Sequence, residues 1–354
     1  MGLPNINIEF IAKGATAIVR SGRGVVACIM ADATEGGAAF ATYTSVADVD
    51  FTKYTEQNYT YLQMIFAGAP SKVHVVRVAA KTPDYTAALK VLKDIKFNYL
   101  TIPSIDEEGV TVVTAWIKEQ RDQYKKTFKA ILPNIKADHE GIINFTTGGI
   151  VSSFSQQTLT AAQYCPRIAG VLAGLTLDRS ATYYKLTDIS AADTPDDPDA
   201  RIDAGELIVV YDGDSYKLGR AVNSLTTFTG DKRADLAKIK IVEGMDLYRD
   251  DIRQTFEDRY VGNYINDYDN KQLFVAAVGS YIKQLEGNVL DRSYDNTAVV
   301  DVEAQRTYLE SSGTDTTNMA DIDIAKANTG SRVFVRSNIK FVDAMEDMDM
   351  VVDM

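Results

Sequence analysis

Residues 332–354 read RVFVRSNIKFVDAMEDMDMVVDM, and this stretch alternates between apolar and polar side chains. In its first half the apolar positions share one face: Val333, Val335, Ile339 and Phe341. The polar positions share the other face: Arg332, Arg336, Asn338 and Lys340. After a break near Ala344 the alternation resumes, with Met348, Met350, Val352 and Met354 against Asp347, Asp349 and Asp353. A period of two is typical of a half-buried β-strand.

The N-terminal residues carry a similar pattern, because Ile6, Ile8 and Phe10 alternate with polar residues. A strand at each end of the chain has edges that need hydrogen-bonding partners. Other copies of the chain can supply them, since strand addition gives main-chain hydrogen bonds and alternate side-chain pockets. Alternatively, both ends can close a sheet within their own domain. We predict strand arms at residues 1–22 and 332–354, and the pattern leaves both arrangements open.

The composition indicates a globular protein with an acidic balance. Its 354 residues include 49 Asp and Glu against 37 Lys and Arg, a formal net charge of −12. A chain with this negative charge is not expected to bind nucleic-acid phosphates independently of sequence, so nucleic acid is not an expected partner. The sequence contains neither a long apolar run nor a charged-then-apolar leader, so we expect cytoplasmic synthesis without a signal peptide and no membrane insertion. Cys28 and Cys165 stand far apart in apolar contexts, which favours buried free thiols.

Residues 23–186 alternate strand and helix patterns. Strands are predicted at 24–30, 72–79, 99–103, 128–132 and 142–145. Helices are predicted at 51–66, 82–96, 110–126 and 159–175. Strands separated by helices argue for a parallel sheet covered on both faces. We therefore expect a Rossmann-like α/β domain here.

The pattern changes after residue 186. Residues 187–205 are acidic and contain prolines, which predicts a solvated loop. Two short strand patterns, 206–211 and 216–222, flank Asp212-Gly213-Asp214, a strong hairpin signal. Residues 234–264 and 270–285 then keep helical spacing. Residues 206–331 are expected to form an α+β domain, so the fold class of the chain is α/β and α+β.

Groups that titrate or coordinate metals are scarce. The two histidines, His74 and His139, have no second histidine or cysteine at metal-ligand spacing. Gly22 and Gly24 precede a predicted strand, whereas a dinucleotide fingerprint follows one. The aspartates of residues 193–203 lack the glycine and glutamate of a calcium loop. We predict no catalytic, cofactor-binding or metal-binding residue, which favours a structural or interaction protein over an enzyme.

One alternative is an α/β enzyme that uses a nucleotide or a sugar phosphate. Its ligand would lie beyond the strands that end near Met30, Ala79 and Pro103, at the carboxyl edge of the sheet. The sequence offers only small polar residues at these positions. Binding of a nucleotide would distinguish this alternative from a structural role.

Three stretches of the C-terminal half resemble a known family: YKLGRAVNSLTTFTGDK (216–232), KIKIVEGMDLYRDDIRQTFEDRYVGNYIND (238–267) and DNKQLFVAAVGSYIKQLE (269–286). With the terminal stretches 2–30 and 325–354, they resemble the contractile tail sheath proteins of myophages, R-type bacteriocins and related contractile injection particles. The length is similar to that of the compact, diffocin-like sheaths of Gram-positive bacteria. Tube proteins, another tail component, are usually shorter and richer in β-structure.

The resemblance implies a structural subunit without a cofactor. Sheath subunits stack as six-membered rings around an inner tube and contract from a metastable extended state, driving the tube through a target cell envelope. The implied partners are further copies of the chain, the tail tube protein, and baseplate and tail terminator proteins. The implied final location is a phage tail or a bacteriocin particle released by lysis of the bacterial cell.

The resemblance also implies that both arms add strands to neighbouring subunits. The predicted N-terminal arm contacts are Ile6, Ile8 and Phe10. The predicted C-terminal arm contacts are Val333, Val335, Ile339, Phe341, Met348, Met350 and Val352. Opposite charges across strands can set register, and we predict this role for Arg332, Arg336, Lys340, Asp347, Asp349 and Asp353. The tube-facing surface is expected around residues 302–328.

Overall fold

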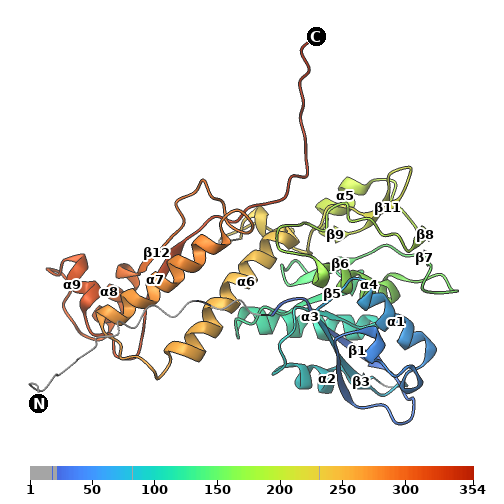
Figure 1. Ribbon diagram of the computed structural model, residues 1–354, viewed down its shortest axis with the longest axis horizontal. Coiled ribbons are helices and arrows are strands. Elements are labelled where there is room, and N and C mark those ends of the chain that lie inside the picture. The colour runs from blue at the N-terminus through green and yellow to red at the C-terminus, as the bar shows by residue number, and fades with distance from the viewer. Residues whose placement is uncertain (1–17, 19–21, 82, 231) are drawn as a thin grey trace, which may run out of the picture. The chain divides into compact units, whose positions relative to one another are not determined.

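The computed structural model describes residues 18, 22–81, 83–230 and 232–354 (Figure 1). The predicted arm residues Ile6, Ile8 and Phe10 lie outside this set. The described chain divides into two compact units. We call residues 22–247 with 343–354 the α/β unit, and residues 248–342 with Ile18 the α+β unit. None of the described helices is long and apolar enough to cross a membrane.

The α/β unit contains a seven-stranded sheet in the order β2-β3-β1-β4-β5-β6-β9. Its strands are β1 (Val25–Ala31), β2 (Phe40–Tyr43), β3 (Lys72–Val78), β4 (Tyr99–Thr101), β5 (Lys129–Pro133), β6 (Ile142–Phe145) and β9 (Glu206–Leu207). All neighbours are parallel except β2, which runs antiparallel to β3 at one edge. The predicted parallel sheet is therefore confirmed, and the short strand β2 is an addition that the sequence pattern did not reveal.

Helices cover both faces of this sheet and create two cores. Alternate residues of β1 take part in each: Val26, Cys28 and Met30 pack in one core, whereas Val25, Ala27 and Ile29 pack in the other. The first core includes α1 (Glu56–Phe66) and α4 (Ala161–Gly174). The second includes α2 (Tyr85–Leu92) and α3 (Glu107–Asp122). Cys28 and Cys165 are free and fully buried, as predicted.

Helices α1 and α4 pack so closely that their crossing requires glycine. A Cβ atom on Gly170 would lie 2.1 Å from the carbonyl oxygen of Ile65, far inside contact distance. Any larger residue would force the two backbones apart. This approach holds α4 close to α1, and α4 stays helical despite Pro166 in its interior.

The remaining elements of the α/β unit are short: the 3-10 helices η1 (Val46–Asp48), η2 (Phe51–Lys53) and η3 (Ala234–Ala237), the strands β7 (Val151–Ser152), β8 (Ile189–Ala191), β10 (Val209–Tyr211) and β11 (Tyr216–Leu218), and helix α5 (Pro198–Asp203). The hairpin predicted around Gly213 is confirmed as β10–β11. The prediction that 187–205 is only a loop is wrong, because it contains β8 and α5. The Asp197-Pro198 pair starts α5, with the aspartate side chain accepting from the Ala200 N–H and proline at the first helical position.

Helix α6 (Ile239–Thr255) begins in the α/β unit and ends in the α+β unit. The helix predicted for 234–264 is interrupted at Lys238, which is extended (φ −87°, ψ 123°) and bridges to Val222. A π-helical turn, η4 (Phe256–Tyr260), follows α6 directly.

The other elements of the α+β unit are α7 (Tyr268–Leu285), β12 (Thr297–Val300), α8 (Val302–Ser311), α9 (Asp321–Lys326) and β13 (Val335–Asn338). Helix α7 matches the helix predicted at 270–285. Its Phe274 packs on the rings of Phe256 and Tyr260, with centroids 5.1 and 4.8 Å away. These aromatic contacts hold α7 against the end of α6 and η4.

Candidate assembly interface

The α+β unit contains a sheet of only two strands. Strands β12 and β13 are antiparallel, with Thr297 opposite Asn338 and Val300 opposite Val335. Among the described residues no third strand pairs with either of them. Each strand therefore has an outer edge whose backbone N–H and C=O groups point away from its partner. The structure thus adopts the in-chain arrangement for residues 335–338. The two outer edges of this sheet have no strand partner among the described residues.

The predicted alternation of the C-terminal segment is present in the burial of its side chains. Val333, Val335, Ile339 and Phe341 are half-buried, whereas Arg332, Arg336, Asn338 and Lys340 are exposed. Beyond β13 the backbone continues to hydrogen-bond within the chain. The Asp291 N–H donates to the Lys340 carbonyl (2.8 Å), and the Val342 N–H donates to the Val289 carbonyl (2.9 Å). The segment has in-chain partners up to residue 342, so of the two arrangements left open by the sequence, the in-chain one holds for this part.

An apolar groove runs along the half-buried face of β13. One part, about 480 Å³, is lined by Ile252 of α6, by Val278 of α7 and by Val335. The next part, about 410 Å³, is lined by residues of η4 and the loop after it, including Tyr260 and Ile265. Both parts share Phe256, Phe274 and Val333. Each part has room for on the order of ten water molecules, and an apolar groove of this size favours an apolar occupant.

The last twelve residues form no helix or strand, and Figure 1 draws them as an extended trace to the C-terminus. The predicted arm side chains Met348, Met350 and Val352 are at least two-thirds exposed. Of the predicted charge-pairing residues, Lys340 pairs with Asp291 (3.0 Å) and Asp347 pairs with Arg220 (2.5 Å). The guanidinium of Arg332 lies 5.2 Å from the Tyr308 ring centroid. Three other members are exposed: Arg336, Asp349 and Asp353.

A buried cluster of charges holds the start of α6 in the α/β unit. The Lys129 ammonium of β5 lies 2.9 Å from Glu243 and 2.8 Å from Asp246. Arg121 of α3 binds Asp246 with two nitrogens, each at 3.0 Å. The remaining contacts of Glu243 are a hydrogen bond from the Tyr99 hydroxyl at 2.5 Å and an ion pair with Arg23. The cluster ties α6 to strands β4 and β5 and to helix α3.

The two carboxylates of this cluster stay ionised because the cations outweigh their burial. Burial alone would raise the pKa of Glu243, but Lys129 and Arg23 lower it to about 2. The same balance, with Lys129 and Arg121 as the cations, lowers the pKa of Asp246. A depressed carboxyl pKa contributes stability above the unfolded pKa, near 4, and that contribution is lost as the pH falls through the folded value. The cluster is therefore intact at neutral pH.

The sequence carries a local signal for this cluster, namely charged residues placed among apolar ones. Glu243 and Asp246 stand three residues apart between the buried residues Val242 and Leu247 of α6. Lys129 likewise interrupts a strand in which all five residues are buried. Charged residues on a buried face need partners, so these positions could have been paired from the sequence.

The carboxyl edge of the large sheet is unsuited to the alternative of a phosphate ligand. Strand β1 lies between β3 and β4, so a ligand of a doubly wound sheet would lie beyond β1 and β4. Asp32, directly after β1, is buried and accepts hydrogen bonds from Asn58 Nδ2 (2.7 Å) and the Thr55 N–H (3.1 Å). Helix α3 begins here with Asp106 as its N-cap and Glu107 in its first turn. Negative charges at these positions repel phosphate.

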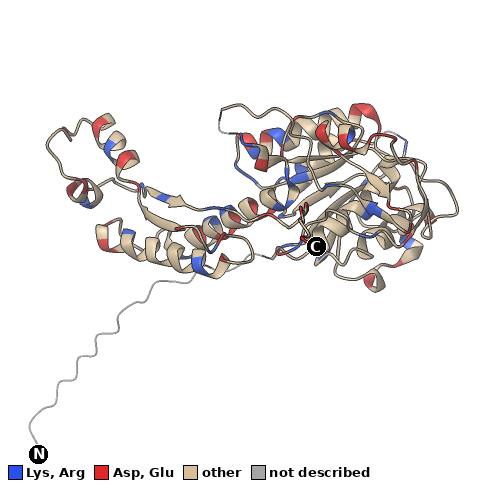
Figure 2. Cartoon of the chain, turned by 90° about the horizontal axis from the view of Figure 1, so that it is seen from above, with Lys and Arg blue, Asp and Glu red and all other residues tan. Residues whose placement is uncertain are grey.

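Charge on the rest of the chain gives no reason to expect a nucleic-acid partner. Figure 2 shows Lys and Arg interspersed with Asp and Glu along the described elements of both units. Nucleic-acid binding proteins instead gather basic residues on one face.

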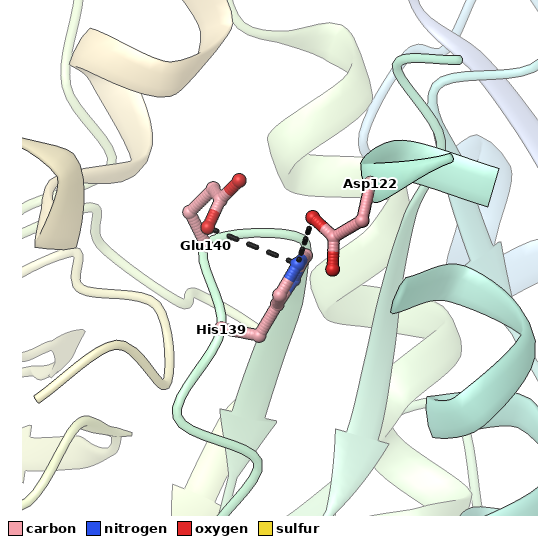
Figure 3. A group of neighbouring side chains, drawn as sticks. All are labelled: Asp122, His139 and Glu140. Carbon is pink, nitrogen blue, oxygen red and sulfur yellow. Dashed lines mark hydrogen bonds and ion pairs between the residues drawn. The ribbon is translucent and has the colours of Figure 1, made fainter. Parts of the chain in front are cut away.

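Three side chains in the α/β unit have the spacing of a metal site: Asp122 at the end of α3, and His139 and Glu140 in the loop before β6 (Figure 3). Their ligand atoms all lie within 4.8 Å of one another. His139 Nδ1, however, accepts a hydrogen bond from the Gly141 N–H (3.0 Å). The neutral ring therefore carries its proton on Nε2, which faces Asp122 Oδ1 at 3.3 Å.

This protonation leaves the ring without a lone pair for a metal at Nε2. A metal-bound histidine needs one free nitrogen lone pair directed at the ion. Glu140 is also engaged, with Lys232 at 3.2 Å and Arg121 at 3.8 Å. The group is therefore a hydrogen-bonded ion-pair network that joins α3 to the loop before β6.

Comparison with known proteins identifies the family. The phage tail sheath protein central domain matches residues 79–224, and the phage tail sheath C-terminal domain matches residues 231–354. The tail sheath protein of Clostridium phage phiCD119 is 36% identical, over 100% of this chain and 99% of that protein.

Solved structures share the fold at lower identity. The contracted helical sheath of the anti-feeding prophage has a TM-score of 0.73 at 14% identity and covers 100% of this chain and 99% of that one. A sheath tail protein from Desulfitobacterium hafniense has a TM-score of 0.69 at 18% identity, covering 84% and 94%. The chain belongs to the phage tail sheath family, and it is a structural tail sheath subunit, not an enzyme.

We predict that Asp246→Ala destabilises the protein. The change leaves Arg121 without its main buried partner, while Lys129 keeps Glu243. Removing one partner of a buried pair costs about 3–5 kcal/mol, and because Lys129 retains Glu243 we expect a loss at the lower end, about 3 kcal/mol. Denaturant unfolding followed by circular dichroism measures it. The control is Asp214→Ala, which removes an exposed pair with Lys185; equal effects of the two variants would contradict a stabilising cluster.

We also predict that divalent metals do not stabilise the protein through His139. Because Nε2 carries the proton, added zinc or nickel should leave the thermal unfolding midpoint unchanged, and so should a chelator. Differential scanning fluorimetry with increasing metal concentration measures this. A saturable rise in the midpoint that disappears in His139→Ala would show that the three side chains bind an ion.

Proposed function

We propose that the chain stacks as six-membered rings around an inner tail tube and contracts from a metastable extended state to drive the tube through a target cell envelope. Membership of the sheath family supports this proposal. So does the fold shared with contracted sheaths of two contractile systems, the anti-feeding prophage and the extracellular system called PVC. A small free-energy gain per subunit, multiplied over many copies, is sufficient to drive such a change without a nucleotide.

The observation that carries the proposal is the incomplete β-structure of the α+β unit. The β12–β13 sheet has outer edges without partners among the described residues, and an apolar groove lies beside β13. Residues 348–354 also expose several apolar side chains to solvent, and their burial against another surface would be favourable. We infer that arm residues of neighbouring copies supply the missing strands: Ile6, Ile8, Phe10, Met348, Met350 and Val352. Main-chain hydrogen bonds along the edge and side chains in the groove would hold them.

Charge would then set the register between copies. Lys340 and Asp347 already have partners in their own chain. The exposed residues Arg336, Asp349 and Asp353 are therefore the members of the predicted set best suited to pairing across strands.

The remaining elements have proposed roles in the same assembly. Residues 1–22 and 332–354 act as arms, and the α/β unit is a Rossmann-like body. Helices α8 and α9, within residues 302–328, would face the tail tube protein. Baseplate and tail terminator proteins would cap the ends of the sheath. The particle would be a phage tail or an R-type bacteriocin, released by lysis of the bacterial cell.

We predict that Met350→Ser with Val352→Ser prevents sheath polymerisation. Both side chains are exposed in the single chain, so folding should be unaffected. Their burial in a neighbour would be lost, at about 1.5–3 kcal/mol for each large apolar side chain. Negative-stain microscopy should find tubes in the parent protein and none in the variant, with unchanged circular dichroism.

A matched control changes the same residue types on the opposite face of the tail. Met345→Ser with Val351→Ser also replaces one exposed methionine and one exposed valine. This control should still form tubes. Normal tubes from the Met350, Val352 variant, or equal loss in both variants, would contradict an alternating arm strand.

We further predict that Arg336→Glu with Lys340→Glu blocks assembly, because like charges would then face each other across strands. The single variant Arg336→Glu separates this effect from loss of the Lys340–Asp291 pair within the chain. Tube formation measured by sedimentation provides the readout. As a control with the same change in net charge, Lys185→Glu with Lys283→Glu should assemble; normal sheaths from the arm variant would dismiss the pairing.

A further inference from the structure

The C-terminal tail contains one buried carboxylate in an otherwise exposed stretch. The Glu346 side chain is 7% exposed. Its neighbours Met345 and Asp347 are 102% and 77% exposed. A buried carboxylate is costly unless ion pairs and hydrogen bonds compensate it. Its burial therefore indicates a specific binding site for this part of the tail.

Two hydroxyl groups of the α/β unit bind one oxygen of this carboxylate. The Thr182 hydroxyl donates to Glu346 Oε1 at 2.6 Å, and the Ser180 hydroxyl lies 3.1 Å from the same atom. Thr182 Oγ1 in turn accepts from the Ala221 N–H (3.0 Å), and Ser180 Oγ accepts from the Thr182 N–H (3.1 Å). Backbone N–H groups thus help to orient both hydroxyls toward the carboxylate.

Two cations bind the rest of the acidic segment. Arg220, which follows β11, lies 3.3 Å from Glu346 Oε2 and 2.5 Å from Asp347 Oδ1. Lys238, directly before α6, forms an ion pair with Asp343 and lies 3.9 Å from Glu346. Hydrogen bonding to Arg220 lowers the pKa of Asp347, in agreement with an engaged carboxylate. The two cations thus contact all three carboxylates of the segment.

We propose that Ser180, Thr182, Arg220 and Lys238 form a binding site for an acidic peptide of the pattern Asp-x-x-Glu-Asp, occupied by residues 343–347 of the same chain. The site fixes the point from which residues 348–354 leave the subunit. Its biological consequence depends on the proposed role of those residues as an arm; the binding itself does not.

Anchoring at this site shortens the reach of the tail. Backbone hydrogen bonds hold the chain as far as Val342, and the acidic segment holds it as far as Asp347. Seven residues remain, which span at most roughly 25 Å when extended. Release of the site would free twelve residues and extend the reach to roughly 40 Å. The site therefore selects which neighbouring surfaces the apolar end can contact.

A spin label tests the site in the full-length chain. Met348→Cys places it two residues beyond Glu346 at an exposed position, and the native Cys28 and Cys165 are fully buried, so labelling is selective. In the parent protein we expect an immobilised component in the electron paramagnetic resonance spectrum. Glu346→Ala and Arg220→Glu with Lys238→Glu should each lose this component. Salt at 1 M, where the Debye length is about 3 Å, should reduce it.

Further variants separate specific binding from general effects. Met345→Ala, next to Glu346 but fully exposed, should keep the immobilised component. Lys238→Glu alone should weaken the immobilised component. Adding Asp343→Lys, which exchanges the two charges of this ion pair, should restore the component. The spectrum should not change on dilution, because the segment belongs to the same chain.

The proposal is overturned if Glu346→Ala keeps the immobilised component, if Met345→Ala loses it equally, or if dilution removes it, which would indicate occupancy by a second copy. Microscopy of tubes is recorded separately. Loss of immobilisation in variants that still assemble would uphold the site and contradict its contribution to the arm.

Discussion

An unpaired backbone is the constraint on which the α+β unit depends. Among the residues that the structure describes, β12 and β13 pair only with each other, which leaves a row of N–H and C=O groups on each outer edge. An isolated two-stranded sheet is marginally stable in water. Helix α7 packs against β12, but a helix cannot supply hydrogen bonds to the backbone N–H and C=O groups of a strand edge. A sheath subunit can use this deficiency, because each strand added by a neighbour gains hydrogen bonds that were absent in the free chain.

Charge inside the α/β unit imposes a second constraint. Glu243 and Asp246 are anchored by Lys129, Arg121 and Arg23, so the first turns of α6 cannot leave the sheet without exposing several charges together. Removing one partner of such a buried pair is costly, because the other charge is left buried without compensation. The start of α6 is thereby fixed to β4, β5 and α3 within the α/β unit.

Local patterns in the sequence predicted most of the elements but few of the contacts. The buried strands of the large sheet and helix α7 were predicted because continuous apolar runs and helical spacing are local signals. Strand β2 was missed because its four residues are largely exposed. The burial of Glu346 could not be predicted, since it depends on Thr182 and Arg220, more than a hundred residues away in the sequence. The alternation of residues 332–341 was correct, although it did not reveal that β12 would pair with part of it.

The exposed methionines of the tail have a chemical consequence. Met348 and Met350 present thioethers to solvent, whereas Met30 and Met64 are completely enclosed in the core. Oxidants convert accessible thioethers to polar, chiral sulfoxides. Mild oxidation would therefore make the tail polar while the folded body keeps its packing, so an oxidised subunit would remain folded with a chemically altered C-terminal segment.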